Sequence, residues 1–505
     1  MIAVDRPETR EMSRRQFLKS SASAVSLMAL AARIQGKTYA DDTSKMNILF
    51  IDIEDCTPKV WGCYGNTICQ TPNIDRLAAT GVRFNAAHCQ GVCCNPSRVS
   101  FLTGLRPSST RIFQNNQPIM EYLPKGTPTL PELVKKKGFY TANVAKLFHG
   151  KHKTPQLAVF DRLEMISKPA GWKGPDPILT FPPLPKELRS PPAPRDQDSK
   201  EYRQWRMARS NRWGASGLTD EQEHDGKVAR IASALLREFS KTNKQFFLSV
   251  GSSRPHTPLI CPKKYIDMYD PEEIPWPPAP PEKDKNVPGV ATNFGRSHDI
   301  YPEPEQAREV IAAYYACVTF LDTQLGMVLD TLDETGLAKN TIVVFFADHG
   351  FHLGEHGVWS KYTLFEATTR VPLIVRVPGV PGNGKTCHEL VELVDLVPTL
   401  GELVGLDLPN NLEGTSFVPL LVDPSQQWKT GAFTEWGDRG KTVRTKRYRY
   451  TERPYQGELV VELYDHETDP WETVNLAEEP GYATTRAELT KLLHTGWKTA
   501  LPPGE

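Results

Sequence analysis

The sequence predicts an α/β fold: a doubly wound, mostly parallel sheet flanked by helices, with a smaller C-terminal α+β subdomain that contains an antiparallel sheet. Three observations lead to this prediction. Short apolar runs typical of buried parallel strands recur along the chain. Amphipathic helical patterns lie between these runs. After about residue 425 the pattern changes to the alternation that is typical of antiparallel strands.

Four apolar runs predict the strands of the main sheet, over residues 48–53, 139–145, 246–250 and 341–347. Each run leads into polar residues that can do chemistry: in chain order Glu54-Asp55, Lys146 with His149, His256, and Asp348-His349. Ligands of open α/β sheets bind outside the carboxyl ends of the strands. We therefore expect these side chains to meet at one edge of the sheet.

The other elements follow from periodicity and from proline. Helices are predicted over residues 72–81, 220–239 (capped by Thr219) and 304–336. Two proline-rich segments, 169–197 and 270–288, predict extended surface insertions that shape access to a site. In the C-terminal part, strands are predicted over residues 441–445, 448–450 and 460–465, before a closing helix at about 484–497.

The first forty residues form a separate segment. Ser13-Arg14-Arg15-Gln16-Phe17-Leu18-Lys19 precedes an apolar stretch from Ala22 to Ala32, and Thr38-Tyr39-Ala40 has the small residues of a cleavage site. This resembles a twin-arginine export signal over residues 1–40, and the apolar stretch is too short for a stable membrane span. The resemblance implies a twin-arginine translocase as partner and a periplasmic or secreted protein. A disordered basic tail is the alternative.

Charge and cysteine content exclude some functions. Lysine plus arginine equals aspartate plus glutamate, 60 each, so nothing in the net charge favours nucleic acid or a membrane surface as a partner. Any recognition of anions must be local. The nine cysteines contain no paired C-x2-C units of a zinc ribbon. Their odd number leaves at least one outside any disulfide, and Cys94 is the candidate.

The segment Cys94-Asn95-Pro96-Ser97-Arg98 is the most specific motif of the chain. Asn95 is a good helix N-cap and Pro96 suits a first helical position, so Cys94 is predicted to lie at the positive end of a helix, where anions are favoured. The motif resembles the modification signature of the formylglycine sulfatases. In that family the cysteine is oxidised to an aldehyde, whose hydrate attacks the sulfur of a sulfate ester. A buried structural cysteine is the alternative.

The resemblance extends from Asn47 to about residue 497 and is closest to the iduronate-2-sulfatase type, within the alkaline phosphatase superfamily. It implies a sulfatase catalytic domain over residues 46–424 and a C-terminal subdomain over residues 425–505. The segments that carry it, beside the cysteine motif, are Gly62-Cys63-Tyr64-Gly65, residues 71–77, Lys146-Leu147-Phe148-His149, residues 254–258, residues 348–357 and Trp359-Ser360-Lys361-Tyr362.

The resemblance also implies a metal site. Glu54, Asp55, Asp348 and His349 would hold a divalent cation beside the modified Cys94. Hard oxygen ligands suit Ca²⁺, while the histidine leaves Mg²⁺ or Mn²⁺ open. The family usually has aspartate at the position of Glu54, and a flexible calcium shell absorbs the added methylene better than magnesium does.

Further roles are implied for five side chains. Lys146 and Lys361 would pair with sulfate oxygens, and Arg98 would orient the aldehyde hydrate. His149 would help to expel sulfate, and His256 would protonate the departing sugar oxygen, because histidine titrates near neutral pH. For each lone lysine or histidine, a surface or structural role is the alternative.

Together these features predict an exported sulfuric ester hydrolase that acts on a sulfated carbohydrate and is matured by a formylglycine-generating enzyme. A phosphodiesterase or phosphonate monoester hydrolase of the same superfamily is one alternative, and Cys94 favours sulfate over it. A catalytically inactive carbohydrate-binding homologue is another, although none of the expected lysines or histidines is missing. The sugar, the sulfate position, exo or endo action and the oligomeric state stay open.

Overall fold

The computed structural model describes residues 43–504 except 150–153, 167, 169–172, 185, 187–191, 195–198 and 295–299. The predicted signal over residues 1–40 lies outside the described residues, as does much of the predicted insertion 169–197.

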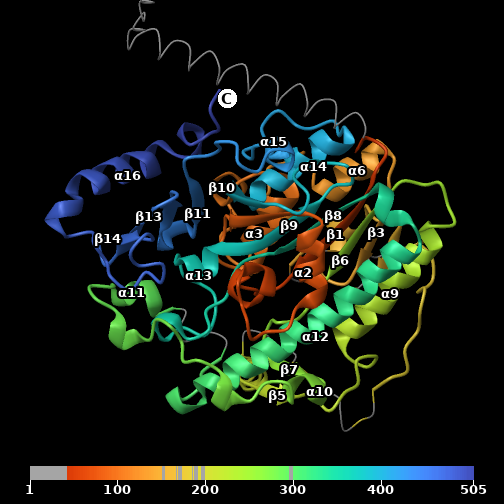
Figure 1. Ribbon diagram of the computed structural model, residues 1–505, viewed down its shortest axis with the longest axis horizontal. Coiled ribbons are helices and arrows are strands. Elements are labelled where there is room, and N and C mark those ends of the chain that lie inside the picture. Colours follow the sequence, from red (N-terminus) through yellow and green to blue (C-terminus); the bar gives the residue numbers. More distant parts are fainter. Residues whose placement is uncertain are drawn as a thin grey trace, which may run out of the picture.

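An eight-stranded sheet forms the centre of the molecule, in the order β10-β2-β9-β8-β1-β6-β3-β4 (Figure 1). Only β9 runs antiparallel to its neighbours within this sheet, which confirms the mostly parallel prediction. The strands are β1 (Asn47–Ile53), β2 (Val82–His88), β3 (Tyr140–Val144), β4 (Arg162–Glu164), β6 (Phe246–Gly251), β8 (Thr341–Ala347), β9 (Arg370–Arg376) and β10 (Thr386–Glu392).

The four predicted apolar runs are the adjacent strands β8, β1, β6 and β3. All residues of β1, β6 and β8 are buried, because helices cover both faces of a parallel sheet. The ring of Phe50 on β1 lies 6.1 Å from that of Phe101 in helix α3, centroid to centroid, whereas Phe345 on β8 contacts Trp61 at 5.2 Å. Apolar packing therefore holds the centre of the sheet rigid below its carboxyl edge.

The sequence did not predict β2, β4, β9 and β10. β2 and β10 carry partly exposed polar residues, and β9 contains Pro372. Proline removes a ladder donor, so it argues against a central strand. Here Pro372 lies opposite the irregularity of β2 between Phe84 and Ala87, where the ladder is already interrupted.

Helices cover the sheet in two groups. α2 (Pro72–Ala79) and α9 (His224–Phe239) both pack against α12 (Ala307–Glu334), whereas α6 (Leu130–Lys137) and α14 (Leu396–Val404) both pack against α3 (Cys94–Thr103) (Figure 1). In the described chain, one helix, Pro304–Glu334, has the length and hydropathy of a membrane span, and 89% of its apolar window is buried inside the protein. Outside these two groups lie α4 (Pro107–Thr110), α5 (Ile119–Tyr122), α7 (Thr154–Leu157), α8 (Lys200–Ser210), α10 (Lys263–Ile266), α11 (Gly289–Thr292), α13 (Glu366–Thr369) and α15 (Val418–Val422).

The predicted start of α9 was wrong. Thr219 does not cap it; the helix begins at His224, after a turn in which the Thr219 carbonyl accepts the N–H groups of Gln222 and Glu223. The side chain of Asp220 instead accepts hydrogen bonds from Lys264 and Tyr265. Because of these tertiary contacts, the helix begins about one turn later in the sequence than predicted.

The C-terminal part contains the predicted antiparallel sheet, β11 (Ala432–Glu435), β12 (Lys441–Arg444), β13 (Tyr448–Tyr455) and β14 (Glu458–Asp465), covered by α16 (Ala483–Thr495). β11 also crosses the segment that leads to α3. The Thr434 hydroxyl donates to the Cys89 carbonyl at 2.6 Å, and the Glu435 N–H donates to the Gln90 carbonyl at 2.9 Å. A small parallel pair that the sequence did not predict, β5 (Trp213–Ala215) and β7 (Leu259–Cys261), lies beside α12.

Candidate active site

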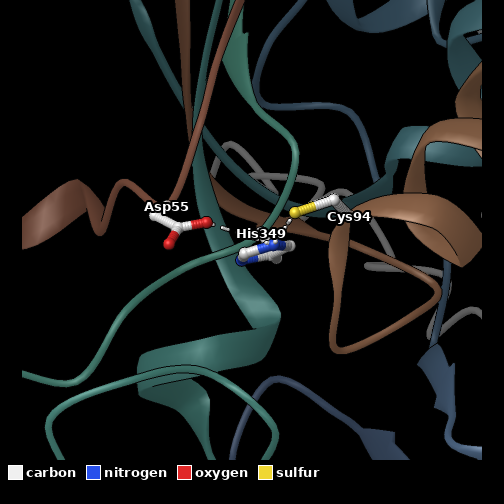
Figure 2. Close-up of side chains that lie close together, drawn as sticks. All are labelled: Asp55, Cys94 and His349. Carbon is white, nitrogen blue, oxygen red and sulfur yellow. Dashed lines mark hydrogen bonds and ion pairs between the residues drawn. The ribbon is translucent and has the colours of Figure 1, made fainter. Parts of the chain in front are cut away.

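Side chains from three elements meet at the carboxyl edge of the sheet. Glu54 and Asp55 follow β1, Asp348 and His349 follow β8, and Cys94 opens α3. Figure 2 shows Asp55, His349 and Cys94 turned toward one another. The expectation that the strand ends meet is therefore confirmed for these residues, all of which are buried.

The His349 Nε2 atom lies at the centre of this group. It is 3.4 Å from Asp55 Oδ1, 3.6 Å from Asp348 Oδ1 and 3.4 Å from Cys94 Sγ. Its Nδ1 atom lies 3.0 Å from the Gly350 carbonyl oxygen, which fixes the ring. Glu54, Cys94 and Asp348 form a second, overlapping group whose ligand atoms lie within 4.8 Å of one another.

These residues fit a divalent cation. Ligand atoms that share a cation at about 2.3–2.6 Å lie roughly 3.3–3.7 Å apart when they occupy neighbouring positions. The separations around His349 have these values. Three buried carboxylates also lie close together, and their oxygens can serve as ligands of a cation in addition to pairing with lysine and arginine side chains. The donor set, mostly oxygen, suits a hard cation such as Ca²⁺.

Asp55 is held in an unusual backbone conformation. Its φ of 53° lies in the left-handed region, which aspartate tolerates better than most residues. Its N–H donates to Asp348 Oδ1 at 3.2 Å, and its carbonyl accepts the Tyr314 hydroxyl at 2.6 Å. The two bonds turn the Asp55 carboxylate toward His349 and away from the line of β1.

Arg98 lies beneath the carboxylates. Its guanidinium donates to Asp52 at 2.6 Å, to Asp348 at 3.1 Å and to Glu54 at 3.4 Å, and also to the Leu147 carbonyl at 2.9 Å. Burial opposes its charge, but the neighbouring carboxylates raise the pKa of Arg98 above its usual value. The contacts of Arg98 are thus with carboxylates and backbone, and its expected role in orienting the nucleophile stays a prediction.

Two lysines complete the charge balance. The Lys361 Nζ atom donates to both oxygens of Asp55, at 2.7 and 2.8 Å, and lies 3.7 Å from Cys94 Sγ. Lys146 forms an ion pair with Glu54. Gly251 at the end of β6 permits this approach, because a Cβ there would lie 1.7 Å from the Lys146 carbonyl oxygen.

The two candidate acid–base histidines differ in environment. His256 is partly exposed, with its Nε2 atom 3.7 Å from Asp55 Oδ2 and its Nδ1 atom 2.9 Å from the Thr257 carbonyl oxygen. His149 is more enclosed, and burial together with the charges of Lys146 and Arg98 lowers its pKa well below the usual value. His256 is therefore the histidine placed to reach both Asp55 and solvent.

The start of α3 differs from the prediction. The N-cap is Cys93 and the helix begins at Cys94; the Asn95 amide instead donates to the carbonyls of Gln114 and Gln117, at 3.1 and 2.8 Å. The prediction that Asn95 is the cap, with Pro96 in the first position, was wrong. Cys94 nevertheless lies in the first turn, as expected. The Ser97 hydroxyl donates to the Asp348 carbonyl at 2.5 Å and ties α3 to the end of β8.

Comparisons with known proteins decide the family. Residues 46–406 match the Sulfatase family, and residues 354–498 match the family described as N-sulphoglucosamine sulphohydrolase, C-terminal. A sulfatase of Formosa agariphila is 33% identical over 475 residues, which cover 90% of this chain and 88% of that relative. This chain belongs to the sulfatase family. The sulfatase described here is thus a sulfuric ester hydrolase.

Two further similarities are to a curated relative and to a solved structure. The sulfatase is 33% identical to iduronate 2-sulfatase of Mus musculus over 431 residues, which cover 77% of this chain and 74% of that relative. Among solved structures, phosphonate monoester hydrolase of Agrobacterium radiobacter shares the fold, with a TM-score of 0.70, 21% identity and coverage of 90% of this chain and 96% of that chain.

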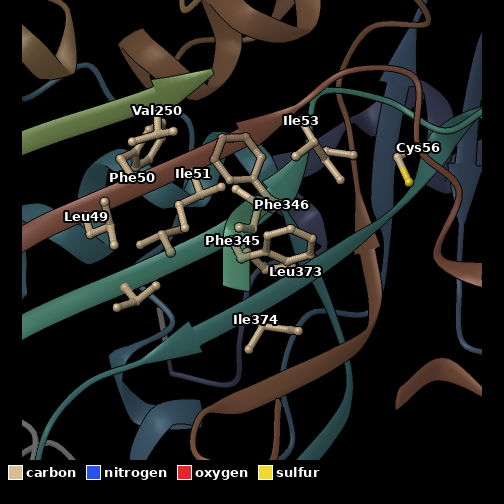
Figure 3. Packing of buried hydrophobic residues seen from close by; sticks show 14 of the residues in the cluster. Leu49, Phe50, Ile51, Ile53, Cys56, Val250, Phe345, Phe346, Leu373 and Ile374 are labelled. Atoms are coloured by element: carbon tan, nitrogen blue, oxygen red, sulfur yellow. The ribbon is translucent and has the colours of Figure 1, made fainter. Parts of the chain in front are cut away.

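Sequence reasoning missed Asp52 and Asp225. Asp52 lies on β1 between Ile51 and Ile53, which belong to the apolar layer of Figure 3, and this charge within an apolar run was a usable signal. Burial raises the pKa of Asp52 to about 6 although Arg98 opposes the shift. Asp225, on α9, carried no signal in the sequence, because its backbone contacts with the loop before His256 depend on the fold.

All nine cysteines of the sulfatase are free. Cys94 is buried, and burial raises the pKa of its thiol well above the usual value, more than nearby Lys361 lowers it. An unmodified thiol here is therefore protonated and a poor nucleophile at neutral pH.

Proposed function

We propose that this sulfatase removes sulfate from a sulfated carbohydrate, with a formylglycine derived from Cys94 as nucleophile and a divalent cation, Ca²⁺ in the first instance, beside it. One observation carries the proposal: Cys94 Sγ lies 3.4 Å from His349 Nε2 and 3.7 Å from Lys361 Nζ, among the buried carboxylates. The similarity to iduronate 2-sulfatase supports a sugar substrate.

Burial raises the pKa of the Cys94 thiol well above its usual value, which makes the unmodified thiol a poor nucleophile and supports a modified residue in its place. A formylglycine hydrate supplies a hydroxyl that attacks the sulfur of the ester. Lys361 is positioned to donate to an oxygen at residue 94, since its ammonium already lies within 3.7 Å of the sulfur. Loss of the positive charge of Lys361 would therefore weaken both the nucleophile and its alignment.

The metal role falls to Glu54, Asp55, Asp348 and His349, and residue 94 belongs to both of the overlapping groups that they form. A divalent cation supplies Lewis-acid polarisation of the sulfate oxygens and lowers the pKa of the attacking hydroxyl. Lys361 and Lys146 add fixed positive charge on the carboxylate side of the site, where negative charge grows on the sulfate oxygens.

The leaving alcohol needs a proton, and His256 is positioned to donate it. Its ring is partly exposed, as a group that meets the substrate must be, and its Nδ1 is held by the Thr257 carbonyl. That bond leaves Nε2 to face the site, 3.7 Å from Asp55. His149, whose pKa is lowered by burial, suits a role as neutral base in the release of sulfate.

Export belongs to the same proposal. The twin-arginine pattern of residues 1–40 supports export of the folded protein to the periplasm or beyond, after a formylglycine-generating enzyme has acted on Cys94. The division into a catalytic domain over residues 46–424 and a C-terminal subdomain over residues 425–505 stays a prediction.

Phosphonate or phosphodiester hydrolysis is the second candidate, favoured by the fold shared with phosphonate monoester hydrolase. The same cation and lysines would stabilise phosphoryl oxygens equally well. The match to the Sulfatase family over most of the chain favours the sulfate ester.

The test is expression with a formylglycine-generating enzyme, followed by peptide mass spectrometry and assays on a 2-O-sulfated uronic-acid disaccharide and on a phenyl phosphonate. We expect an aldehyde at Cys94 and release of sulfate. Cys94→Ala should lose essentially all turnover while it stays folded. Cys63→Ala, at a partly exposed cysteine outside the motif, is the control. Full activity with only thiol at Cys94, or turnover of the phosphonate alone, would overturn the proposal.

A further inference from the structure

A cavity of about 490 Å³ opens where the segment after α11 meets the turn between β11 and β12 and the end of β13. None of the predicted site residues lines it. Its wall includes Asn293, Phe294, Trp436, Asp438, Arg439 and Arg453. The volume lies within the usual range for a small-ligand site.

Two aromatic rings and one arginine form the most distinctive part of this wall. The rings of Phe294 and Trp436 pack edge to face, with centroids 5.3 Å apart. The Arg439 guanidinium lies 4.3 Å from the Phe294 centroid and 5.4 Å from that of Trp436. Within the part of the chain that the structure describes, no carboxylate forms an ion pair with Arg439. Its positive charge is thus held in place by the rings and remains available to an anion.

A second guanidinium lies in the same wall. Arg453 is buried and donates through Nε to Glu462 at 2.5 Å, whereas its Nη2 atom is buried without a hydrogen-bond partner among the described residues. A buried donor without a partner destabilises the protein, so a ligand that accepts from it binds more tightly. Two guanidinium groups therefore border one cavity, with the carboxylate of Asp438 beside them.

This combination matches an anionic sugar residue. Aromatic rings pack against the apolar C–H face of a sugar ring. Guanidinium groups bind carboxylate or sulfate oxygens in pairs of parallel hydrogen bonds. A carboxylate such as Asp438 accepts from sugar hydroxyls. A neutral apolar ligand would leave both arginines unpaired, so the chemistry selects a saccharide that carries negative charge.

Packing connects the cavity to the reaction centre. Phe294 and Trp436 contact Tyr362, with ring centroids 5.4 and 6.3 Å away. Tyr362 directly follows Lys361, and it packs in the same apolar cluster as Cys93, the neighbour of Cys94. A single layer of packed side chains, made of Phe294, Trp436 and Tyr362, therefore separates the cavity from the segment that carries Cys94.

We infer that this cavity is a subsite for a second anionic residue of an oligosaccharide whose sulfate is bound at Cys94, with Arg439 and Arg453 as the groups that bind its carboxylate or sulfate. The inference rests on the proposed function and extends it: the preferred substrate is an acidic oligosaccharide rather than an isolated sulfated sugar. Arg439 then determines specificity and takes no part in the chemical step.

The test measures binding, so that it is independent of turnover. In the Cys94→Ala background, isothermal calorimetry with a heparin tetrasaccharide compares the parent with Arg439→Gln and Arg439→Lys. We expect the glutamine variant to bind about tenfold more weakly and the lysine variant to fall between. Arg209→Gln is the matched control, because Arg209 also lies over a tryptophan, Trp205, on α8 away from the cavity. It should bind like the parent.

Two further measurements are needed. One identifies which group of the saccharide Arg439 binds, and the other distinguishes failure of the subsite from failure of the proposed reaction. A carboxyl-reduced tetrasaccharide that loses the dependence on Arg439 assigns the carboxylate; one that keeps it assigns a sulfate. Equal affinities for parent and Arg439→Gln, or no binding of the tetrasaccharide by the parent, would overturn the subsite. If binding depends on Arg439 while the matured wild-type protein releases no sulfate, the subsite stands and the proposed reaction fails.

Discussion

The carboxylate of Asp225, at the start of α9, accepts the backbone N–H of Arg254 at 2.7 Å, two residues before His256. Its other oxygen accepts the N–H of Ser253 at 2.8 Å. Asp225 is buried, so both bonds are shielded from water. A residue on a helix thereby holds the loop that carries the proposed proton donor, without touching the substrate.

Asp225→Asn should therefore reduce turnover through the position of His256. The amide keeps one acceptor and loses the other, and we expect about a tenfold loss in kcat on a sugar sulfate. A nitrophenyl sulfate, whose leaving group departs with little help, should lose much less. Asp220→Asn, at a neighbouring aspartate that binds Lys264 and Tyr265 instead, is the control. Equal losses on both substrates would assign Asp225 to general stability.

The proposed metal site predicts a link between cation and folding. A ligand that binds only the native state stabilises it by about 2.7 kcal/mol at a hundred times its Kd. Chelation should therefore lower both activity and Tm by a measurable amount in a thermal scan, and added Ca²⁺ should restore both. Asp348→Asn should lose the response to chelator, whereas Asp407→Asn, at a surface ion pair with Lys136, should keep it. Full activity after exhaustive chelation, with no metal by elemental analysis, would rule the site out.

His256 predicts a dependence on the leaving group. A sugar hydroxyl needs a proton as it departs, whereas an acidic phenol hardly does. His256→Ala should slow sugar-sulfate hydrolysis by about 10² to 10⁴ and nitrophenyl sulfate hydrolysis far less. His494→Ala, at a histidine in the C-terminal helix that pairs with Glu452, should change neither rate. A uniform loss would place the proton donor elsewhere.

His88 predicts a pH dependence of stability. It is buried at the end of β2, and neither ring nitrogen has a hydrogen-bond partner among the described residues. Burial lowers its pKa from 6.5 to about 3. Because the folded pKa lies below the unfolded one, the contribution to stability is complete above about pH 6.5. It is lost as the pH falls toward about 3, by up to about 1.4 kcal/mol per pH unit.

Urea unfolding between pH 4 and pH 7 measures this effect. His88→Leu should flatten the decrease in unfolding free energy over that interval, because the buried group no longer gains a proton on unfolding. His388→Leu, at an exposed histidine on β10, should retain the slope of the wild type. An unchanged slope in His88→Leu would show that other groups cause the acid sensitivity.

The sequence predicted the centre of the molecule well because burial on both faces makes a strand continuously apolar, as in β1, β6 and β8. It failed where tertiary contacts override local preference. Asn95 is a good N-cap by type, yet its amide binds two distant carbonyls, and Pro372 lies in a central strand because a neighbouring irregularity accommodates it.

The residues of the site likewise fall into those that the sequence could predict and those that it could not. Glu54, Asp55, Asp348 and His349 could be predicted because each follows a recognisable strand, and Cys94 because its motif is specific. Arg439 and Asp225 could not, since their importance depends on which rings or backbone groups the fold brings to them. The spacing of residues along the sequence does not reveal side chains whose role depends on tertiary contacts.

The hydrogen bonds from β11 to Cys89 and Gln90 set an order of events during biosynthesis. β11 lies far along the chain from Cys94, so these contacts cannot form until the ribosome has made that strand. In the folded protein, Cys94 has 1% of its surface exposed. An enzyme that oxidises this cysteine therefore has to reach it before the fold closes around it. If Cys94 is modified as proposed, the rate at which the chain folds limits the fraction of molecules that mature.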